Sequence, residues 1–496
     1  MLIPKKRAPK PPRTTGVGRF HPDQRLMHFN RHDSLLFQDV LGGGCLVLGK
    51  AGGGKSSGVV PAVADSWLSA GGNCVFLTVK PADADMWQAF AEQCGAKSIT
   101  CFSLADRFNP LREELVRSGD VAGQAQRLLE IALTPLRRRQ QHSTSSDGGY
   151  FEAEGERAVA YVLTILRLAP GFNLSFRTLY EALVQLPTSL REAQSESWRH
   201  RNRLYQALLA ADRSPLSAVD RADLEDAARY LLEEVPRMPS RTRASVVTTV
   251  TSAIFPLVHA AVGHCLNGES DTWSPRYITE CSGAALVLDC PIQTYGPAAA
   301  VLQRLCLTAI ENAVLQRTMT PDSAPVLLVL DEGHNVLDPD VDVPFSTSAR
   351  DRRGALLVST QTVGQIRSCC SRSRDPQAAG DALVGMMSSR IFCNTSDPAT
   401  LELISRTFAE TLQTKVSMTE GEAQRDKHNR GRSTGSTSFQ REYAADVRAI
   451  DVARLRTGGR QNNHVVQAYI SNGRLWSNGR PSILVNFPQY RLNAVR

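Results

Sequence analysis

The sequence predicts an α/β protein in which a central, mostly parallel sheet is interrupted by an all-α segment. Apolar strands alternate with helical patterns near both ends of the chain, whereas residues 111–282 show mainly helical periodicity. Charge-bearing or glycine-rich segments follow several of the strands directly. At 496 residues, with 42% hydrophobic and 21% charged residues, the chain is long enough for two to four folded domains.

The first 40 residues form a basic, proline-rich leader that we expect to be partly disordered. They contain eight Lys or Arg against three Asp, a balance of +5, and residues 452–496 contain seven Arg and no acid, a balance of +7. The total is +8, so the remaining residues sum to −4. Basic ends on an acidic body indicate contact with nucleic acid or a membrane surface, although solvated termini that only aid solubility are the alternative.

Residues 41–110 are predicted to be the first part of the sheet-containing domain. A strand over 45–49 is followed by a helix over 55–68, and further strands are expected at 73–79 and 98–102.

The first strand runs into Gly-x4-Gly-Lys-Ser, the pattern of a phosphate-binding loop. Glycines let the backbone turn its N–H groups toward phosphates at the positive end of the next helix. Lys55 is predicted to reach the β- and γ-phosphates, and the Ser56 hydroxyl to ligate Mg²⁺. The expected ligands are therefore ATP and Mg²⁺, unless the segment is only a glycine-rich turn. The predicted nucleotide contacts are Gly49, Lys50, Ala51, Gly52, Gly53, Gly54, Lys55, Ser56 and Ser57.

Residues 111–282 are predicted to form an all-α insertion, with helical patterns at 150–168, 220–234 and 241–265. Residues 283–496 are predicted to complete the sheet. Strands are expected at 284–290, 325–331, 355–360, 390–394, 464–470 and 482–487, with a long helix at 297–317. The polar segment 415–442 is expected to be a mobile loop.

A buried strand over 325–331 ends in Asp331 and Glu332. This is the Walker B arrangement, in which Asp331 holds Mg²⁺ through water and Glu332 polarises the attacking water. Gln361 follows the next strand and is predicted to contact the γ-phosphate or that water.

Three arginines, Arg350, Arg352 and Arg353, lie between these two strands in the sequence. Any one of them is a candidate arginine finger, often supplied by a neighbouring subunit. A solvated helix end is the alternative.

Residues 331–334 also spell the D-E-x-H box of superfamily 2 helicases. That hypothesis is disfavoured because 276 positions separate Lys55 from Asp331, and because the arginine-rich motif of a second motor domain is missing. His334 is therefore predicted to be an ordinary residue that starts the next helix.

Taken together, these motifs resemble the TraG/TraD-like coupling proteins of type IV secretion, within the HerA/FtsK group of RecA-like ATPases. The resemblance covers roughly residues 41–490 and also includes 75–80, 241–250, 353–361 and 394–397. The chain departs from the family in three ways: it has a basic leader in place of a transmembrane pair, Thr78 where an acid is common, and Gly333 after the Walker B glutamate.

The resemblance implies a homo-hexamer that pumps DNA without sequence preference, with Arg350 as first choice for the finger and Arg353 as second. Relaxase or other cargo is expected on the all-α domain, and a secretion-channel or membrane-anchor protein is a further expected partner. The location is expected to be cytoplasmic, or peripheral at the inner face of the cell membrane. Two alternatives stay open: a HerA/FtsK-like motor in repair, segregation or defence, and an ATP-gated protein-cargo adaptor.

Overall fold

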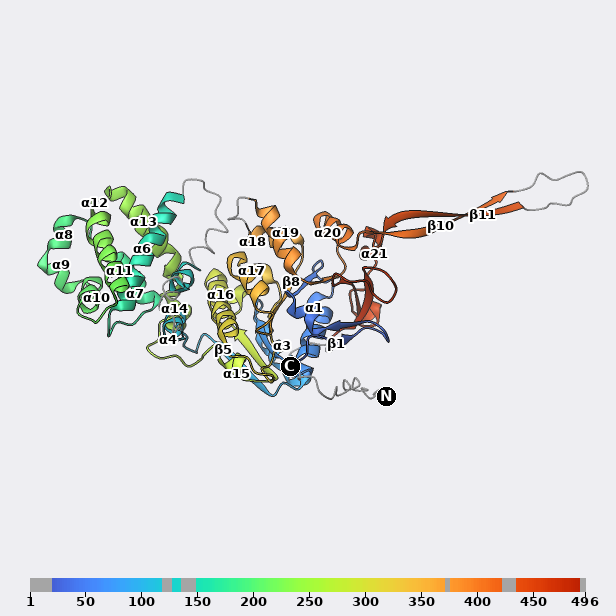
Figure 1. Cartoon of the computed structure of the whole chain (residues 1–496), viewed down its shortest axis with the longest axis horizontal. Coiled ribbons are helices and arrows are strands. Elements are labelled where there is room, and N and C mark those ends of the chain that lie inside the picture. The colour runs from blue at the N-terminus through green and yellow to red at the C-terminus, as the bar shows by residue number, and fades with distance from the viewer. Residues whose placement is uncertain (1–19, 118–126, 135–148, 371–374, 422–433, 491–496) are drawn as a thin grey trace, which may run out of the picture.

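The computed structural model describes residues 20–117, 127–134, 149–370, 375–421 and 434–490. Its centre is a nine-stranded sheet with the order β13-β12-β9-β3-β8-β7-β4-β6-β5 (Figure 1). Seven neighbouring strands, from β9 to β5, are parallel, and β12 and β13 are antiparallel additions at one edge. The strands are β3 (Cys45–Leu48), β4 (Asn73–Leu77), β5 (Ser98–Ser103), β6 (Ala284–Asp289), β7 (Val326–Leu330), β8 (Gly354–Thr360), β9 (Ser389–Phe392), β12 (Val465–Ser471) and β13 (Ile483–Pro488). The predicted α/β class with a mostly parallel sheet is confirmed.

Helices cover both faces of this sheet, which explains why its central strands are apolar at nearly every position. On one face, alternate residues such as Val47 and Phe76 pack against the first group of helices. On the other face, residues such as Leu46 and Val75 pack against the second group. The first group is α1 (Phe37–Leu41), α2 (Val60–Ser69) and α3 (Asp83–Cys94); the second is α16 (Ile292–Gln316), α17 (Pro339–Ser348), α18 (Val363–Cys369), α19 (Pro376–Met386) and α20 (Pro398–Phe408).

Most of the described chain between β5 and β6 is helical and forms a lobe at one end of the molecule, whereas α15 (Tyr277–Glu280) packs beside β4 and β6 of the sheet (Figure 1). The central helix, α6, packs against α7, α10, α11 and α13. At Gly155 a Cβ atom would lie 2.5 Å from Val250, so glycine permits the close approach of α6 and α13. Residues 127–134 are also helical. The remaining elements are α4 (Pro110–Arg117), α6 (Gly149–Leu168), α7 (Phe176–Val184), α8 (Leu190–Gln194), α9 (Glu196–Arg201), α10 (Arg203–Asp212), α11 (Ala218–Arg229), η3 (Tyr230–Glu234), α12 (Val235–Arg237), α13 (Ser240–Ile254), η4 (Phe255–Leu257), α14 (Ala260–Leu266) and α15 (Tyr277–Glu280).

The prediction of a mobile loop at 415–442 is wrong for those residues of the segment that the structure describes. β10 (Glu410–Gly421) and β11 (Thr434–Ala445) form a two-stranded antiparallel ribbon, which projects from the opposite end of the molecule to the helical lobe (Figure 1). Cross-strand pairing holds the segment extended although its composition is polar. Residues 422–433 lie outside the described part. The ribbon is followed by α21 (Ala449–Ala453) and the 3₁₀ turn η6 (Arg460–Asn462).

The second half of the predicted leader is folded onto the sheet domain. β1 (Arg25–His28) pairs with β2 (Ser34–Leu36), and Phe20, Leu35 and Phe37 are fully buried. An ion pair of 3.1 Å between Arg474 and Asp39 fixes this segment to the loop between β12 and β13. The domain thus begins by residue 20, whereas residues 1–19 lie outside the described part.

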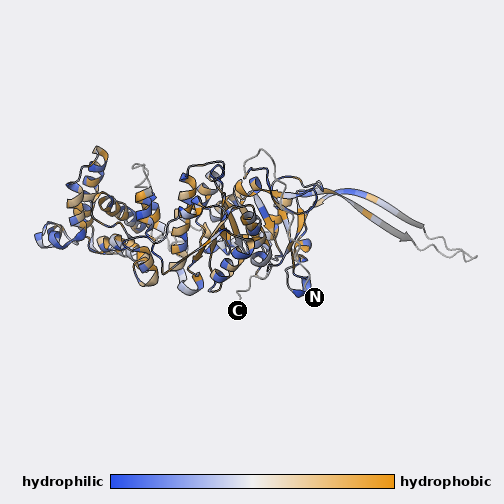
Figure 2. Cartoon of the chain, turned by 90° about the horizontal axis from the view of Figure 1, so that it is seen from below, coloured by the Kyte–Doolittle hydropathy of each residue, from blue (hydrophilic) through white to orange (hydrophobic). Residues whose placement is uncertain are grey.

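One described helix, α16, is long and apolar enough to cross a membrane by length and composition, and the bent pair Ser240–Leu257 and Ala260–Leu266 would make a second. In α16, 83% of the qualifying window is buried inside the fold. Core helices of folded proteins meet the same criteria, and Figure 2 shows hydrophobic residues gathered around the sheet against which α16 packs.

A buried ionic cluster ties α16 to α17. The Arg304 guanidinium donates to Glu311 at 2.5 Å and to Asp342 at 2.7 Å, and all three side chains are at most 2% exposed. One cation faces two carboxylates, and burial raises the pKa of Glu311 to about 8. The adjacent carboxylate adds to this rise, while Arg304 opposes it. Near neutral pH Glu311 therefore keeps its proton inside the cluster.

We expect the stability of the fold to decrease as the pH rises from about 5 to about 8. Folded Glu311 keeps its proton in this range while the unfolded chain loses it, so unfolding releases a proton, with a slope of up to about 1.4 kcal/mol per pH unit for one group. Thermal unfolding of the parent and of Glu311→Gln across this range measures the effect. The Gln variant, which keeps a neutral donor, should show a flatter dependence; equal slopes would contradict the assignment.

Candidate functional site

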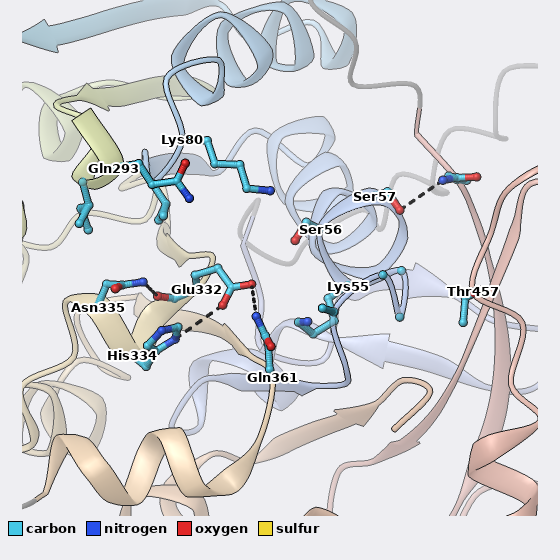
Figure 3. A pocket seen from close by; sticks show the side chains of 17 residues that line it. Lys55, Ser56, Ser57, Lys80, Gln293, Glu332, His334, Asn335, Gln361 and Thr457 are labelled. Carbon is cyan, nitrogen blue, oxygen red and sulfur yellow. Dashed lines mark hydrogen bonds and ion pairs between the residues drawn. The ribbon is translucent and has the colours of Figure 1, made fainter. Parts of the chain in front are cut away.

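A cavity of about 620 Å³ opens at the carboxyl edge of the sheet, where β3, β4, β7 and β8 end (Figure 3). Parallel alignment brings these strand ends together from segments more than 250 residues apart. The cavity is lined by Ala51, Gly52, Gly53, Gly54, Lys55, Ser56, Ser57, Val79, Lys80, Ile292, Gln293, Glu332, His334, Asn335, Gln361, Thr457 and Gln489.

The loop after β3 adopts a conformation that requires glycine. Gly52 and Gly54 have φ values of +70° and +91°. At Gly53, a Cβ atom would lie 2.9 Å from the Lys50 carbonyl oxygen and 3.0 Å from that of Asn394. The Lys50 N–H donates to this Asn394 oxygen at 2.9 Å, which anchors the loop to the end of β9. The backbone is thus folded tightly around the amino end of the helical segment formed by η1 (Lys55–Val59) and α2.

Lys55 lies inside this loop and is only 4% exposed. Its ammonium group donates to the Gly49 carbonyl at 2.7 Å and to the Lys50 carbonyl at 3.2 Å. The carbonyl groups of Gly49 and Lys50 therefore fix the position of the Lys55 ammonium group. Neither of these two residues lines the cavity, whereas residues 51–57 do.

The two Walker B acids follow β7, as their positions in the sequence predict, but they are placed differently. Glu332 lines the cavity in the left-handed region at φ +51°, and its Oε1 accepts from Gln361 Nε2 at 3.4 Å. Asp331 accepts from the Glu332 N–H at 3.2 Å and does not line the cavity. Glu332 and Gln361 are thus brought together at the ends of β7 and β8.

His334 lies in a short helical turn, the 3₁₀ turn η5 (Gly333–Asn335), as its position in the sequence predicts, and it also contributes to the cavity. Its Nδ1 is 3.6 Å from Glu332 Oε2 (Figure 3). The same atom is 3.4 Å from Thr360 Oγ1 on β8. Gly333 makes this geometry possible, because a Cβ atom there would lie 3.0 Å from Val358 and would crowd β8. His334 therefore links the Walker B glutamate to the strand that carries Gln361.

A third wall comes from the segments after β4 and β6. Lys80 and Gln293 both line the cavity, and Figure 3 shows Lys80 directed into it. Asp83 caps the turn by accepting from the N–H groups of Val79 and Lys80 at 2.8 and 2.7 Å, although burial raises the pKa of this carboxyl group. Lys80 follows a buried strand, as Glu332 and Gln361 do. A position shortly after an apolar run is therefore the sequence feature from which Lys80 could be predicted to lie at the cavity.

The far end of the cavity is formed by the C-terminal part of the chain. Thr457 and Gln489 line it, and Gln489 connects the Gly459 N–H, at 2.7 Å, with the Ser57 hydroxyl, at 3.4 Å. The Tyr490 N–H donates to the Ser57 carbonyl at 2.7 Å. Sequence analysis missed Thr457 and Gln489, because no motif marks them and only the antiparallel return of β12 and β13 brings them here.

The three candidate arginines lie at the other edge of the sheet, before β8 begins. Arg352 donates to the Arg317 carbonyl at 2.9 Å, and Arg353 donates to the carbonyls of Pro321 and Ser323. Arg350 is exposed, and no hydrogen bond or ion pair of its side chain to the described residues is found. None of the three reaches the cavity of its own chain, so a role for Arg350 in a neighbouring subunit stays a prediction.

The residues present fit a nucleotide triphosphate with Mg²⁺. The glycine loop places backbone N–H groups at a helix terminus, Gly52 has no atom near the position of a Cβ, and the Lys55 ammonium group lies within the loop. Hydroxyl and carboxylate oxygens are the donors that Mg²⁺ prefers: Ser56 and Glu332 supply them inside the cavity, and Asp331 precedes Glu332 in the chain without lining the cavity. Glu332 Oε2 is buried without a hydrogen-bond partner in the described structure, and such an atom suits an incoming water.

Comparison with known proteins agrees with this site. Residues 325–455, from β7 to α21, match the family described as the TraM recognition site of TraD and TraG. This segment contains Glu332, Gln361 and the ribbon. Over this segment the chain is similar to TraD and TraG. No curated protein matches the sequence.

Solved structures share the fold of this chain over its whole length. The bacterial conjugative coupling protein TrwBΔN70 in complex with sulphate has a TM-score of 0.60 at 15% identity, and the match covers 100% of this chain and 96% of that one. Its unbound form has a TM-score of 0.58, also at 15% identity, with 92% and 88% covered. TrwB in complex with the GTP analogue GDPNP has the same score and identity, with 93% and 88% covered. At this identity the likeness shows a shared RecA-like fold.

We expect Lys55→Ala and Glu332→Gln to fail in different ways. Lys55 is placed to contact phosphates in both ground and transition states, so its loss should weaken nucleotide binding at least tenfold. Glu332→Gln should bind ATP normally and hydrolyse it at least a hundredfold more slowly. Titration with a fluorescent ATP analogue and single-turnover hydrolysis separate the two. Equal loss of binding in both variants would contradict these roles.

Proposed function

We propose that this protein is an ATP-driven motor that moves DNA, of the coupling-protein type that links a DNA and relaxase substrate to a conjugative or mobile-element transfer apparatus. The observation that carries the proposal is the joint placement, in one cavity, of a glycine-lined phosphate loop, Lys55 and the Glu332–Gln361 pair. A phosphate loop alone fits many nucleotide-binding proteins. A carboxylate aimed into the same cavity and bonded to a sensor glutamine fits hydrolysis.

ATP hydrolysis at this site needs a polarised water and charge stabilisation at the γ-phosphate. Glu332 is the group that orients and polarises the water, and Gln361 holds Glu332 and reports the state of the nucleotide to β8. Lys55 and the loop N–H groups stabilise the phosphates. Mg²⁺, held by Ser56 and by Asp331 through water, would supply charge neutralisation between the β- and γ-phosphates. The structures of TrwB with ADP and Mg²⁺ and with an ATP analogue support this assignment by their fold.

The proposed motor is a homo-hexamer. Its cavity contains no arginine among the described lining residues, while Arg350 stands exposed at the opposite edge of the sheet. A ring in which this edge of one subunit faces the cavity of the next would complete each site. The fold shared with a conjugative coupling protein supports DNA as the substrate, and the net charge of +8 supports binding of DNA through its phosphates without sequence preference.

We further propose that cargo such as a relaxase binds the all-α lobe, and that a channel or membrane-anchor protein is a second partner. The match to a TraM recognition site over 325–455 supports a protein partner on the second half of the sheet domain. The protein would act in the cytoplasm or peripherally at the inner face of the cell membrane.

We expect DNA to stimulate ATP hydrolysis by the full-length protein several-fold at low salt. Stimulation should be nearly independent of DNA sequence and should decrease steeply with salt, because phosphate contacts release counterions. Turnover measured with and without DNA across a salt series tests this, with Glu332→Gln as the control for contaminating activity. A rate indifferent to DNA, with assembly verified, would contradict the motor and favour an ATP-gated adaptor.

We expect Arg350→Ala to bind ATP normally and to hydrolyse it at least tenfold more slowly. When mixed with Lys55→Ala subunits it should regain part of the activity, because some interfaces in a mixed ring then contain both an intact cavity and an intact arginine. Turnover across a series of mixing ratios measures this recovery. Arg353→Ala serves as the comparison, since Arg353 is committed to two backbone carbonyls. No recovery in verified mixed rings would exclude Arg350 from a role in trans.

A further inference from the structure

We propose that His334 is a positioning residue for ATP hydrolysis, which holds the Glu332 carboxylate through its Nδ1–H and joins it to β8. The proposal rests on the proposed function, in which Glu332 orients and polarises the attacking water. The observation that carries it is a ring of polar contacts. This ring runs from Glu332 through His334 to β8 and α18, and it returns to Glu332 through Gln361.

The Thr360 hydroxyl fixes the direction of the hydrogen bonds in this ring. Gln365 Oε1 accepts from the backbone N–H groups of Gln361 at 2.9 Å and of Thr362 at 3.4 Å, so this atom is the amide oxygen and not the nitrogen. The Thr360 hydroxyl lies 2.7 Å from the same oxygen and donates its one proton to it. The Thr360 oxygen therefore acts only as an acceptor toward His334.

The neighbours of His334 place a proton on its Nδ1 atom. This nitrogen lies 3.4 Å from Thr360 Oγ1 and 3.6 Å from Glu332 Oε2. The hydroxyl oxygen has already donated its proton, and an ionised carboxylate oxygen can only accept. A ring nitrogen between two acceptors carries the hydrogen. The Nδ1–H is thus shared between the strand and the carboxylate, at distances that are long for either bond alone.

Glu332 offers an oxygen that needs this proton. Its Oε2 atom is buried and has no hydrogen-bond partner among the described residues, whereas Oε1 accepts from Gln361 Nε2 at 3.4 Å. A buried carboxylate oxygen without a donor is unfavourable. A small rotation of the imidazole would satisfy Oε2, and the carboxylate would then be held from both sides. The second lone pair of Oε2 stays available for the attacking water.

The backbone around His334 is fixed, and its side chain faces the cavity. The His334 carbonyl accepts from the Cys369 thiol on α18 at 3.4 Å, and the Asn335 side chain donates to the Glu332 carbonyl at 2.9 Å. The side chains of His334 and Glu332 are 25% and 23% exposed, so the histidine is not a residue that fills the core. Figure 3 shows the imidazole beside the Glu332 carboxylate at the cavity wall.

A fixed carboxylate matters because a general base acts only within hydrogen-bond reach of the water that it polarises. A carboxylate that is held by Gln361 alone can rotate about its last side-chain bond. A second donor from His334 prevents this rotation and fixes the lone pair that faces the water. The ring also connects the position of Glu332 with that of Gln361, because Thr360 and Gln361 are consecutive residues.

The first test separates the Nδ1–H of His334 from the volume of its side chain. His334→Leu removes the donor and keeps a similar volume, whereas His334→Asn keeps an N–H donor near the position of Nδ1. Single-turnover ATP hydrolysis and affinity for a fluorescent ATP analogue are measured on the full-length protein with Mg²⁺ and DNA. We expect His334→Leu to hydrolyse ATP about tenfold or more slowly, with an affinity within about threefold of the parent. His334→Asn should recover most of the lost rate.

A parent rate in His334→Leu, or equal losses in the Leu and Asn variants, would overturn the positioning role. A loss of affinity that accounts for the loss of rate would overturn it as well, because it would indicate a damaged cavity. Hydrolysis by the parent would leave the proposed function standing in each case, whereas no hydrolysis by the parent would overturn both. If His334→Leu does not fold, His334→Ala takes its place with the same expected results.

The second test determines whether His334 acts through Glu332. In the Glu332→Gln background no ionised carboxylate is left to position, so adding His334→Leu should change the residual single-turnover rate by less than about twofold. The same substitution in the parent background is the matched comparison. A further loss of about tenfold in the Glu332→Gln background would assign His334 a role that is independent of Glu332 and would overturn the proposal.

Discussion

The parallel hydrogen bonding of β3 with β8, and of β8 with β7, is the constraint on which the site depends. Leu48 pairs with Thr360, and Leu330 pairs with Val358, so the phosphate loop, Gln361 and the Walker B acids leave the sheet at one edge. Parallel strands need buried faces on both sides, and the two groups of helices supply them. A change that shifted one of these strands by one residue would turn its core side chains to the other face and would move the candidate site residue that follows it.

Much of this arrangement can be predicted from the sequence, because the strongest local signals coincide with the chemistry. One apolar run ends in glycines, and a second ends in two acids. Each run predicts a buried strand, and the residues that follow each strand are the candidate site residues. The helical insertion is also predictable, since helical periodicity is a local property that does not depend on what packs against it. The placement of Glu332 beside Gln361 then follows from topology.

The features that sequence analysis missed depend on contacts between distant segments. The ribbon has polar, glycine-containing strands, and its apolar positions are paired only between the two strands, so neither strand carries a strong signal alone. Thr457 and Gln489 reach the cavity only because β12 and β13 return antiparallel beside β9. No periodic pattern in the sequence predicts that His334 lines the cavity, because its position there depends on the close packing of Gly333 against Val358. Local patterns cannot report such pairings.

The segment that follows the ribbon is connected to the phosphate loop through Asn394. The Asn394 carbonyl accepts from the Lys50 N–H and anchors the loop, while the Asn394 side chain donates to the carbonyls of Ala453 and Leu455, at the end of α21. One residue after β9 thus joins the backbone around Lys55 to the chain that leads into β12. The shape of the candidate site therefore depends on hydrogen bonds between segments that are far apart in the sequence.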